Sequence, residues 1–372
     1  MPSVVLLGNF FLIFLRQGGR RLTVKKSFSI FVSIVVLSIV GVLFLSIDSA
    51  TFDILMKADG EYLFYSALLV VMGWSLDALK FVCLSRAAGE SLTLRQTMSV
   101  VWINYFGCAI TPMQSGGGPF QIYLLYRNGV SVGKSVAITL VRTIQVLFLL
   151  ALVLPFALIS EPEFFEQHMM LKWFVGYVIL FISFAAFLLV VSVVRPKWIK
   201  RWSSGGLLKM KHIGILKPKR LLIAIRWINK EIDNYSTNIR LFTSTGRNWF
   251  FISLLVAALH LLVYMSIMPC LIVAMGFDVS YMQCMLAESL LLFLLYFVPT
   301  PGGSGAAEGG AAAVFALFVP WNLAGVMAVA WRLLSEYTGV ALGTVIAIRL
   351  LGWCGVDEVM REESVNNEDE IK

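Results

Sequence analysis

The hydrophobic positions of this chain form six long runs, separated by short polar segments or by stretches rich in glycine and proline. The runs extend over about 27–47, 61–83, 134–159, 172–194, 248–276 and 322–348. Each has roughly 20 residues or more, the length that an α-helix needs to cross ~30 Å of hydrocarbon. The pattern therefore predicts six transmembrane helices.

The composition agrees with a membrane protein. Of the 372 residues, 59% are hydrophobic and 14% are charged, and the mean hydropathy is +0.83, unlike a soluble domain. The apolar stretch within residues 1–26 is short and has no basic residue ahead of it, so we interpret it as an interfacial segment rather than a signal peptide. The five cysteines contain no C-x-x-C pair, and the sequence indicates neither a metal site nor a cofactor.

Lysine and arginine are distributed unevenly beside the runs, and cytoplasmic loops of membrane proteins carry the excess. Five basic residues and no acidic residue lie between Arg16 and Lys26, and 13 lie in 195–247 beside only two acids. The loops 48–61 and 160–167 are acidic and are predicted to be external. We expect a multi-pass protein of the cytoplasmic membrane with both termini inside. The loop 195–247 also interleaves tryptophan and isoleucine with its basic residues, so binding to anionic lipid stays open beside a plain orientation signal.

Two segments, about 97–126 and 282–319, each consist of two short apolar arms on either side of a glycine-rich turn. Each must enter and leave the membrane on the same side, because otherwise the basic loops would not all lie in the cytoplasm. We predict that they are re-entrant helical hairpins, the first entering from inside and the second from outside. Their turns have the sequences "TPMQSGGG" and "TPGGSG". Irregular backbone at membrane depth is tolerated only where it is buried in protein or lines a cavity.

The two hairpins belong to a diverged internal sequence repeat. Thr111 and Pro112 align with Thr300 and Pro301, and an arginine, Arg142 or Arg332, follows the proline by 30 or 31 residues. The chain thus divides into an N-terminal segment, 1–26, and one membrane domain, 27–349, with repeat A at 61–194, a basic cytoplasmic loop at 195–247, repeat B at 248–349, and an acidic cytoplasmic tail at 350–372.

The predicted fold is therefore an all-α polytopic membrane protein, with six long spans and two re-entrant hairpins in an inverted-topology repeat. Many secondary transporters share this plan, and their discontinuous helices meet near the midplane and form the substrate site there.

Charged side chains inside the spans are rare and mark candidate functional positions. Asp77 and Lys80 are three residues apart and can neutralise each other on one helical face. Arg332 and Glu336 are four apart, which allows either an internal pair or a substrate role. Arg142 has no acid within a helical turn. Its partner is either a lipid phosphate or a group from elsewhere, for which we considered Glu288, Glu308 or a backbone carbonyl.

Glu308 falls in the first turn of the helix after the second glycine-rich turn. A carboxylate there is favoured by the helix dipole without any function, yet at membrane depth it also suits ion coupling or a pair with Arg332. In the first hairpin, Pro119 is predicted at the first helical position, where free N–H groups suit an anion. Gln121 and Tyr123 add neutral groups for a headgroup, although ordinary packing explains Tyr123 equally well.

The motifs "TPMQSGGGPFQIYLLYRNGVSVGKS" and "VPTPGGSGAAEGG" resemble the paired signatures of the flippase-like family built on the transmembrane region of lysylphosphatidylglycerol synthetase, the multiple peptide resistance factor. The resemblance covers about residues 30–350, with a departure at Gly118, where a polar residue is expected. It implies a stand-alone form without the aminoacyltransferase domain, which translocates a phospholipid or an isoprenoid-linked lipid. The candidate substrate-binding residues are Thr111, Pro112, Gly116, Gly117, Gln121, Tyr123, Arg142, Thr300, Pro301, Gly302, Gly303, Glu308, Arg332 and Glu336.

Other functions have less support from the residues. A serine protease centred on Ser304 lacks a histidine after the serine, and a membrane glycosyltransferase lacks an acidic motif such as D-x-D. The sequence favours a transporter over an enzyme. A glycosyltransferase, or an accessory subunit of a lipid-modifying enzyme, stays open as the alternative. The expected partners are membrane lipids with an anionic or zwitterionic headgroup, with such an enzyme as a further candidate, and nucleic acid is not expected.

Overall fold

The structure is a computed structural model that describes residues 29–30, 32–37, 39–41, 54, 56–111, 114–160, 176–177, 179–180, 246–295 and 298–349. Within these ranges the secondary structure is helical and no strand forms, which confirms the all-α prediction there. The predicted loop 195–247 and tail 350–372 lie almost wholly outside the described residues, as does most of the span 172–194. The first predicted span is described only in part.

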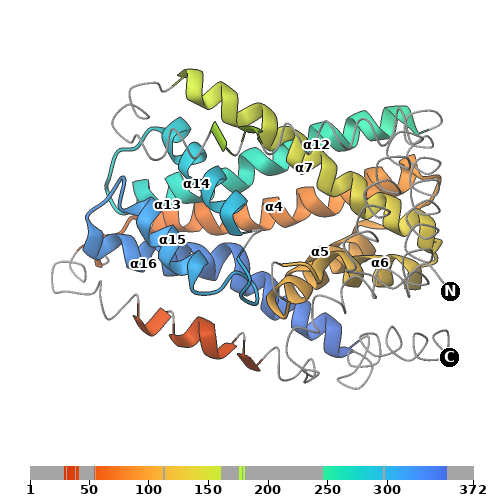
Figure 1. Cartoon of the computed structure of the whole chain (residues 1–372), viewed down its shortest axis with the longest axis horizontal. Coiled ribbons are helices and arrows are strands. Elements are labelled where there is room, and N and C mark those ends of the chain that lie inside the picture. Colours follow the sequence, from red (N-terminus) through yellow and green to blue (C-terminus); the bar gives the residue numbers. More distant parts are fainter. Residues whose placement is uncertain are drawn as a thin grey trace, which may run out of the picture.

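Among the described helices, three stretches are long and apolar enough to cross a membrane. They are α4 (Gly60–Ala87), the first part of α7 (Val132–Ser160), and the pair of helices α12 (Arg247–Met265) and α13 (Ile267–Ala274). Helix α4 runs through the middle of the molecule and packs against α5, α7, α12 and α13 (Figure 1). The core of the domain forms around its second half.

Large apolar side chains cover the outer faces of these helices. On α4 and α12 the exposed ones include Leu63, Phe64, Leu68, Val71, Met72, Phe251, Ile252, Leu255, Leu259 and Leu262. A soluble protein rarely exposes so continuous an apolar surface, whereas a helix that faces lipid does so along its length. This surface agrees with a membrane-embedded domain.

The structure also contains two pairs of shorter helices. Helix α5 (Leu94–Ala109) packs against α6 (Gly117–Arg127), and α14 (Tyr281–Leu295) packs against α15 (Ala306–Phe315). Their lengths of 16, 11, 15 and 10 residues correspond to roughly 15 to 24 Å, less than the hydrocarbon thickness. The bounds agree with the arms predicted from the sequence.

One prediction about the first hairpin is wrong. Helix α6 begins at Gly117, so Pro119 occupies its third position and not its first. The turn closes early because the Gly116 N–H donates to Thr111 Oγ1, 2.8 Å away. This amide is therefore already engaged by the protein and is not free to bind an anion.

The last helix combines α16 (Trp321–Arg332), the π-helical turn η1 (Leu333–Tyr337) and the helical residues 338–349. It packs closely against α5 through two glycines four residues apart. A Cβ atom on Gly339 would lie 2.8 Å from the Tyr105 ring, and one on Gly343 would overlap the Trp102 carbonyl oxygen. The absence of side chains lets the two backbones approach, as in small-xxx-small contacts between membrane helices.

Candidate functional site

The two glycine-rich turns, which come from opposite halves of the chain, are in direct contact. The Gly302 N–H donates to the Cys108 carbonyl at 3.2 Å and to the Thr111 carbonyl at 3.3 Å. Gly302 and its neighbour Gly303 have φ angles of 62° and 69°, in the left-handed region that side chains disfavour. Glycine at these positions therefore lets the second turn present its backbone to the end of α5.

Each turn is also closed internally by its threonine. Thr111 Oγ1 donates to the Gly107 carbonyl at 2.8 Å while it accepts from Gly116. A Cβ atom on Gly116 would lie 2.5 Å from Thr111 Cγ2, so a larger residue does not fit there. Pro112, the other candidate at this turn, lies outside the described residues.

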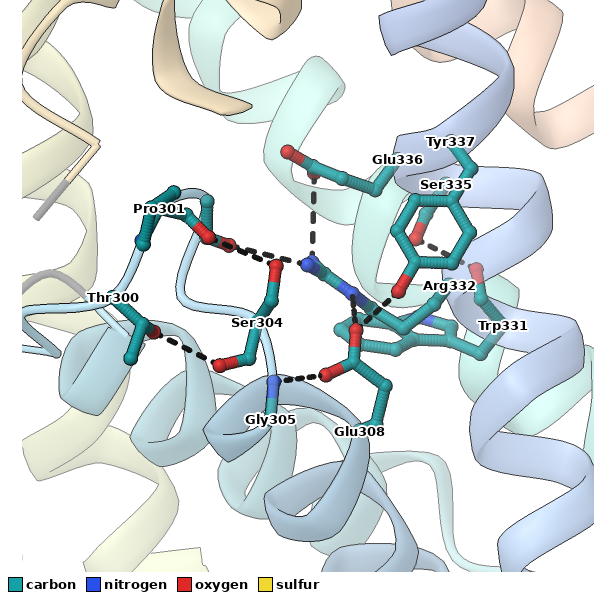
Figure 2. A network of polar contacts seen from close by, with 11 residues as sticks. Thr300, Pro301, Ser304, Gly305, Glu308, Trp331, Arg332, Ser335, Glu336 and Tyr337 are labelled. Atoms are coloured by element: carbon teal, nitrogen blue, oxygen red, sulfur yellow. Dashed lines mark hydrogen bonds and ion pairs between the residues drawn. The ribbon is translucent and has the colours of Figure 1, made fainter. Parts of the chain in front are cut away.

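In the second turn, Thr300 Oγ1 donates to the Ser304 carbonyl at 2.9 Å, and Ser304 Oγ donates to the Pro301 carbonyl at 2.8 Å (Figure 2). The Ser304 hydroxyl thus stabilises the conformation of the second turn.

Arg332 on α16 connects the second turn to two carboxylates (Figure 2). Its Nη2 donates to the Gly302 carbonyl at 3.3 Å, so Gly302 contacts the first turn through its N–H and the arginine through its oxygen. Arg332 Nε lies 3.5 Å from Glu308 Oε1, and Nη1 lies 3.8 Å from Glu336 Oε2. The side chain is 2% exposed. The two acids considered for Arg332 in the sequence therefore both contact it.

The π-helical turn η1 explains how one arginine faces two neighbours on its own helix. Its i→i+5 hydrogen bonding widens the turn after Arg332, so that residues four and five positions later both face back toward it. Glu336 forms the ion pair, and the Tyr337 ring centre lies 5.4 Å from Arg332 Cζ. Such turns occur often at functional sites.

Glu308 is held from three directions. It is the third residue of α15, and its Oε2 accepts a 2.5 Å hydrogen bond from the Gly305 N–H. Its Oε1 accepts from the Tyr337 hydroxyl and faces Arg332. The carboxylate thus lies in the first turn of α15, as the sequence predicted, and caps that helix. It also forms the predicted pair with Arg332, whereas ion coupling stays a prediction.

A second ionic cluster lies between α4 and α7. Arg142 binds both oxygens of Asp77, with its Nε at 3.2 Å and its Nη2 at 2.7 Å, and Lys80 Nζ lies 2.7 Å from Asp77 Oδ1. The predicted Asp77 and Lys80 pair is confirmed. Within the described residues, the alternative partners Glu288 and Glu308 form no hydrogen bond or ion pair with Arg142. The spacing of residues in the sequence does not indicate that Asp77 is the partner of Arg142, because this contact depends on how α4 and α7 pack.

The remaining candidates do not join these clusters. Gln121 on α6 is 1% exposed, and its Nε2 has no hydrogen-bond partner in the described part of the chain. Tyr123 is partly exposed on the same helix. Gly117 is a packing residue, since a Cβ atom there would overlap Asn104 Oδ1 on α5.

A small cavity lies beside α4 and is bordered by α5, α12, α13 and η1. It is lined by Val70, Gly73, Trp74, Tyr105, His260, Tyr264, Ile267 and Ser335. Its volume of about 10 Å³ is room for a single water molecule. Trp74 is one turn before Asp77 on α4, and Ser335 directly precedes Glu336, so the cavity lies close to both clusters.

Comparison with known proteins points to one family. The profile described as "Lysylphosphatidylglycerol synthase TM region" matches residues 28–343. A similar protein is a "UPF0104 membrane protein" from Archaeoglobus fulgidus, 26% identical over 299 residues that cover 79% of this chain and 88% of the relative.

Proposed function

This chain belongs to the family of the lysylphosphatidylglycerol synthase transmembrane region, and from that premise we propose that it is a lipid translocase. The substrate is a phospholipid or an isoprenoid-linked lipid whose anionic or zwitterionic headgroup moves across the cytoplasmic membrane. The site lies where the two glycine-rich turns meet. Both termini are cytoplasmic in this proposal, and the two helical hairpins are re-entrant from opposite sides.

The contact between the two turns carries the proposal. Gly302 joins the end of α5 to Arg332 through its own backbone, so a movement of one hairpin is transmitted to the other. Transporters built from inverted repeats place their substrate at such a meeting of broken helices. The contact brings together parts of repeat A and repeat B that are almost 200 residues apart in the sequence.

The two arginines suit a lipid phosphate because a guanidinium binds phosphate oxygens through two parallel hydrogen bonds. Arg142 is the more accessible of the two, with 17% of its side chain exposed against 2% for Arg332. We therefore expect Arg142 to meet the headgroup first, with Asp77 holding its orientation. Arg332 orders the second turn and engages the phosphate only after the helices separate.

Translocation requires such a separation. The described cavity has room for one water molecule and not for a headgroup. The close contacts that must open lie between the turns, at Gly302, and around α4. In this interpretation the structure corresponds to a closed state of the transport cycle.

The test is lipid flipping in vesicles that contain the purified protein and a fluorescent phosphatidylglycerol. An external quencher reports how fast the labelled lipid leaves the inner leaflet. We expect the wild-type protein to accelerate this step, Arg142→Lys to retain part of the activity, and Arg142→Gln to lose at least about tenfold, because one charge-assisted hydrogen bond is worth roughly 1.5 to 3 kcal/mol.

Ser304→Ala is the matched control. Its hydroxyl closes the second turn and is not assigned to the substrate, so we expect flipping to persist. If Arg142→Gln flips lipid at the wild-type rate, the phosphate role of this arginine is wrong. If the wild-type protein flips neither this lipid nor an isoprenoid-linked one, an accessory role in lipid modification gains support.

A further inference from the structure

Glu288 is a buried acid that the site described above does not use. It lies in the middle of α14, its side chain is fully buried, and neither carboxyl oxygen has a hydrogen-bond partner among the described residues. No described lysine, arginine or histidine forms an ion pair with it. The surroundings are apolar, since Cys284 and Leu291 on the same helix belong to one buried cluster and Met285 and Leu290 to another.

One polar group of α16 faces the Glu288 carboxyl. The indole Nε1 of Trp331 on α16 is also buried and without a well-formed hydrogen bond, and it faces the Glu288 carboxyl. Among the described residues, the titratable groups near Glu288 are the Cys284 thiol on α14 and the Tyr264 hydroxyl on α12, and both are neutral in their ordinary state. Nothing among these groups balances a negative charge.

A carboxylate in this position would bury a charge without a partner, which is strongly unfavourable even after relaxation of the protein. A protonated carboxyl is a neutral group and costs much less. The closed state therefore holds Glu288 with its proton. The next residue after Trp331 is Arg332, so the helix that faces this acid is also the helix that binds the second turn.

We propose that Glu288 is the proton-binding site that couples lipid translocation to the proton gradient, an inference that rests on the proposed function. The proton is bound while Trp331 of α16 covers the carboxyl in the buried cluster it shares with Cys284 and Leu291. It leaves when the hairpin moves and water reaches the carboxyl, and a new proton must bind before the helices close again. The proton is the only species exchanged at this site, and the carboxylate left behind is the base that receives the next one.

The proton site is tested without any lipid assay. Infrared spectra of the purified protein at neutral pH should contain a C=O stretching band of a protonated carboxylic acid in a dry environment. We expect Glu288→Gln to remove this band and the control Glu90→Gln to keep it, because Glu90 is partly exposed and paired with Lys134. A band that is unchanged in Glu288→Gln overturns the proton site.

Coupling is tested by flipping assays in vesicles with the pH gradient set inward or outward. A gradient of one pH unit changes the equilibrium constant of a step coupled to one proton about tenfold, and reversing the gradient changes it about a hundredfold. Wild-type initial rates should therefore differ between the two directions, by up to about a hundredfold. Glu288→Gln and Glu288→Met should flip lipid at equal rates in both directions. Glu288→Met is included because its apolar side chain suits a site without water, in case the amide of Glu288→Gln disturbs folding.

The outcomes separate the two proposals. Flipping by the wild-type protein that does not respond to the gradient overturns the coupling and leaves lipid translocation standing. Absence of flipping by the wild-type protein contradicts the proposed function and the coupling built on it, while the infrared band still decides whether Glu288 binds a proton.

Discussion

At the scale of single residues, Arg332 is the side chain whose replacement has the clearest expected result. Removing one partner of a buried ion pair costs about 3 to 5 kcal/mol. In Arg332→Gln, Glu308 keeps its hydrogen bonds from Gly305 and Tyr337, whereas Glu336 loses its ion-pair partner. We therefore expect Arg332→Gln to lower the unfolding temperature strongly, and the double change with Glu336→Gln to recover most of that loss.

Lipid flipping by the same two variants separates a structural arginine from one that binds substrate. A structural role predicts that activity returns together with stability in the double variant. A phosphate role predicts that stability returns and activity does not. If the single variant is as stable as the wild-type protein, the ion pairs around Arg332 contribute little and our account of this cluster is wrong.

Ion pairs within one helix could be predicted from the sequence, whereas the ion pair of Arg142 with another helix could not. The helical spacings of Asp77 with Lys80 and of Arg332 with Glu336 predicted pairs that the structure contains, because i,i+3 and i,i+4 contacts depend on one helix alone. The partner of Arg142 depends on how two helices pack, and the sequence contains no local signal for it. Whether Glu288 has a partner is a question of the same kind.

At the scale of elements, the second turn should tolerate a methyl group at one glycine and not at another. Gly302 has a φ angle of 62°, and Ala in this region costs about 1 to 2 kcal/mol and displaces the N–H that contacts α5. Gly309 is a helical position of α15 with nothing within 4 Å of its Cβ position. We expect Gly302→Ala to reduce flipping and thermal stability, and Gly309→Ala to retain flipping with stability unchanged or raised by up to about 1 kcal/mol. Equal effects of the two substitutions would show that contact between the turns is not needed.

Element boundaries were predicted well wherever they follow glycine, proline and the length of an apolar run. The arms of both hairpins agree with the sequence within a few residues, apart from the early start of α6. The π-helical turn at Leu333–Tyr337 had no counterpart in the sequence analysis. The turn coincides with contacts of Arg332 and Tyr337 with Glu308 on α15, and a local sequence pattern does not encode these contacts.

At the scale of the whole molecule, the all-α fold and the membrane environment follow from composition and from the lengths of the apolar runs, and the family agrees with both. The inverted orientation of the two halves rests on a different argument, the bias of lysine and arginine toward the cytoplasm. The orientation of the chain in the bilayer therefore remains a prediction and needs its own test.

Single cysteines can provide that test. On a background without the five native cysteines, Arg127→Cys at the end of α6 and Pro320→Cys at the start of α16 both lie on exposed positions. The charge pattern places Arg127 beside the basic inner loops, whereas Pro320 follows the second hairpin, which is predicted to return outward. A membrane-impermeant maleimide added to intact cells should label Pro320→Cys and leave Arg127→Cys unlabelled until the membrane is permeabilised. Labelling of both positions from outside, or of neither, would remove the inverted repeat and with it the argument that the two turns meet from opposite sides of the membrane.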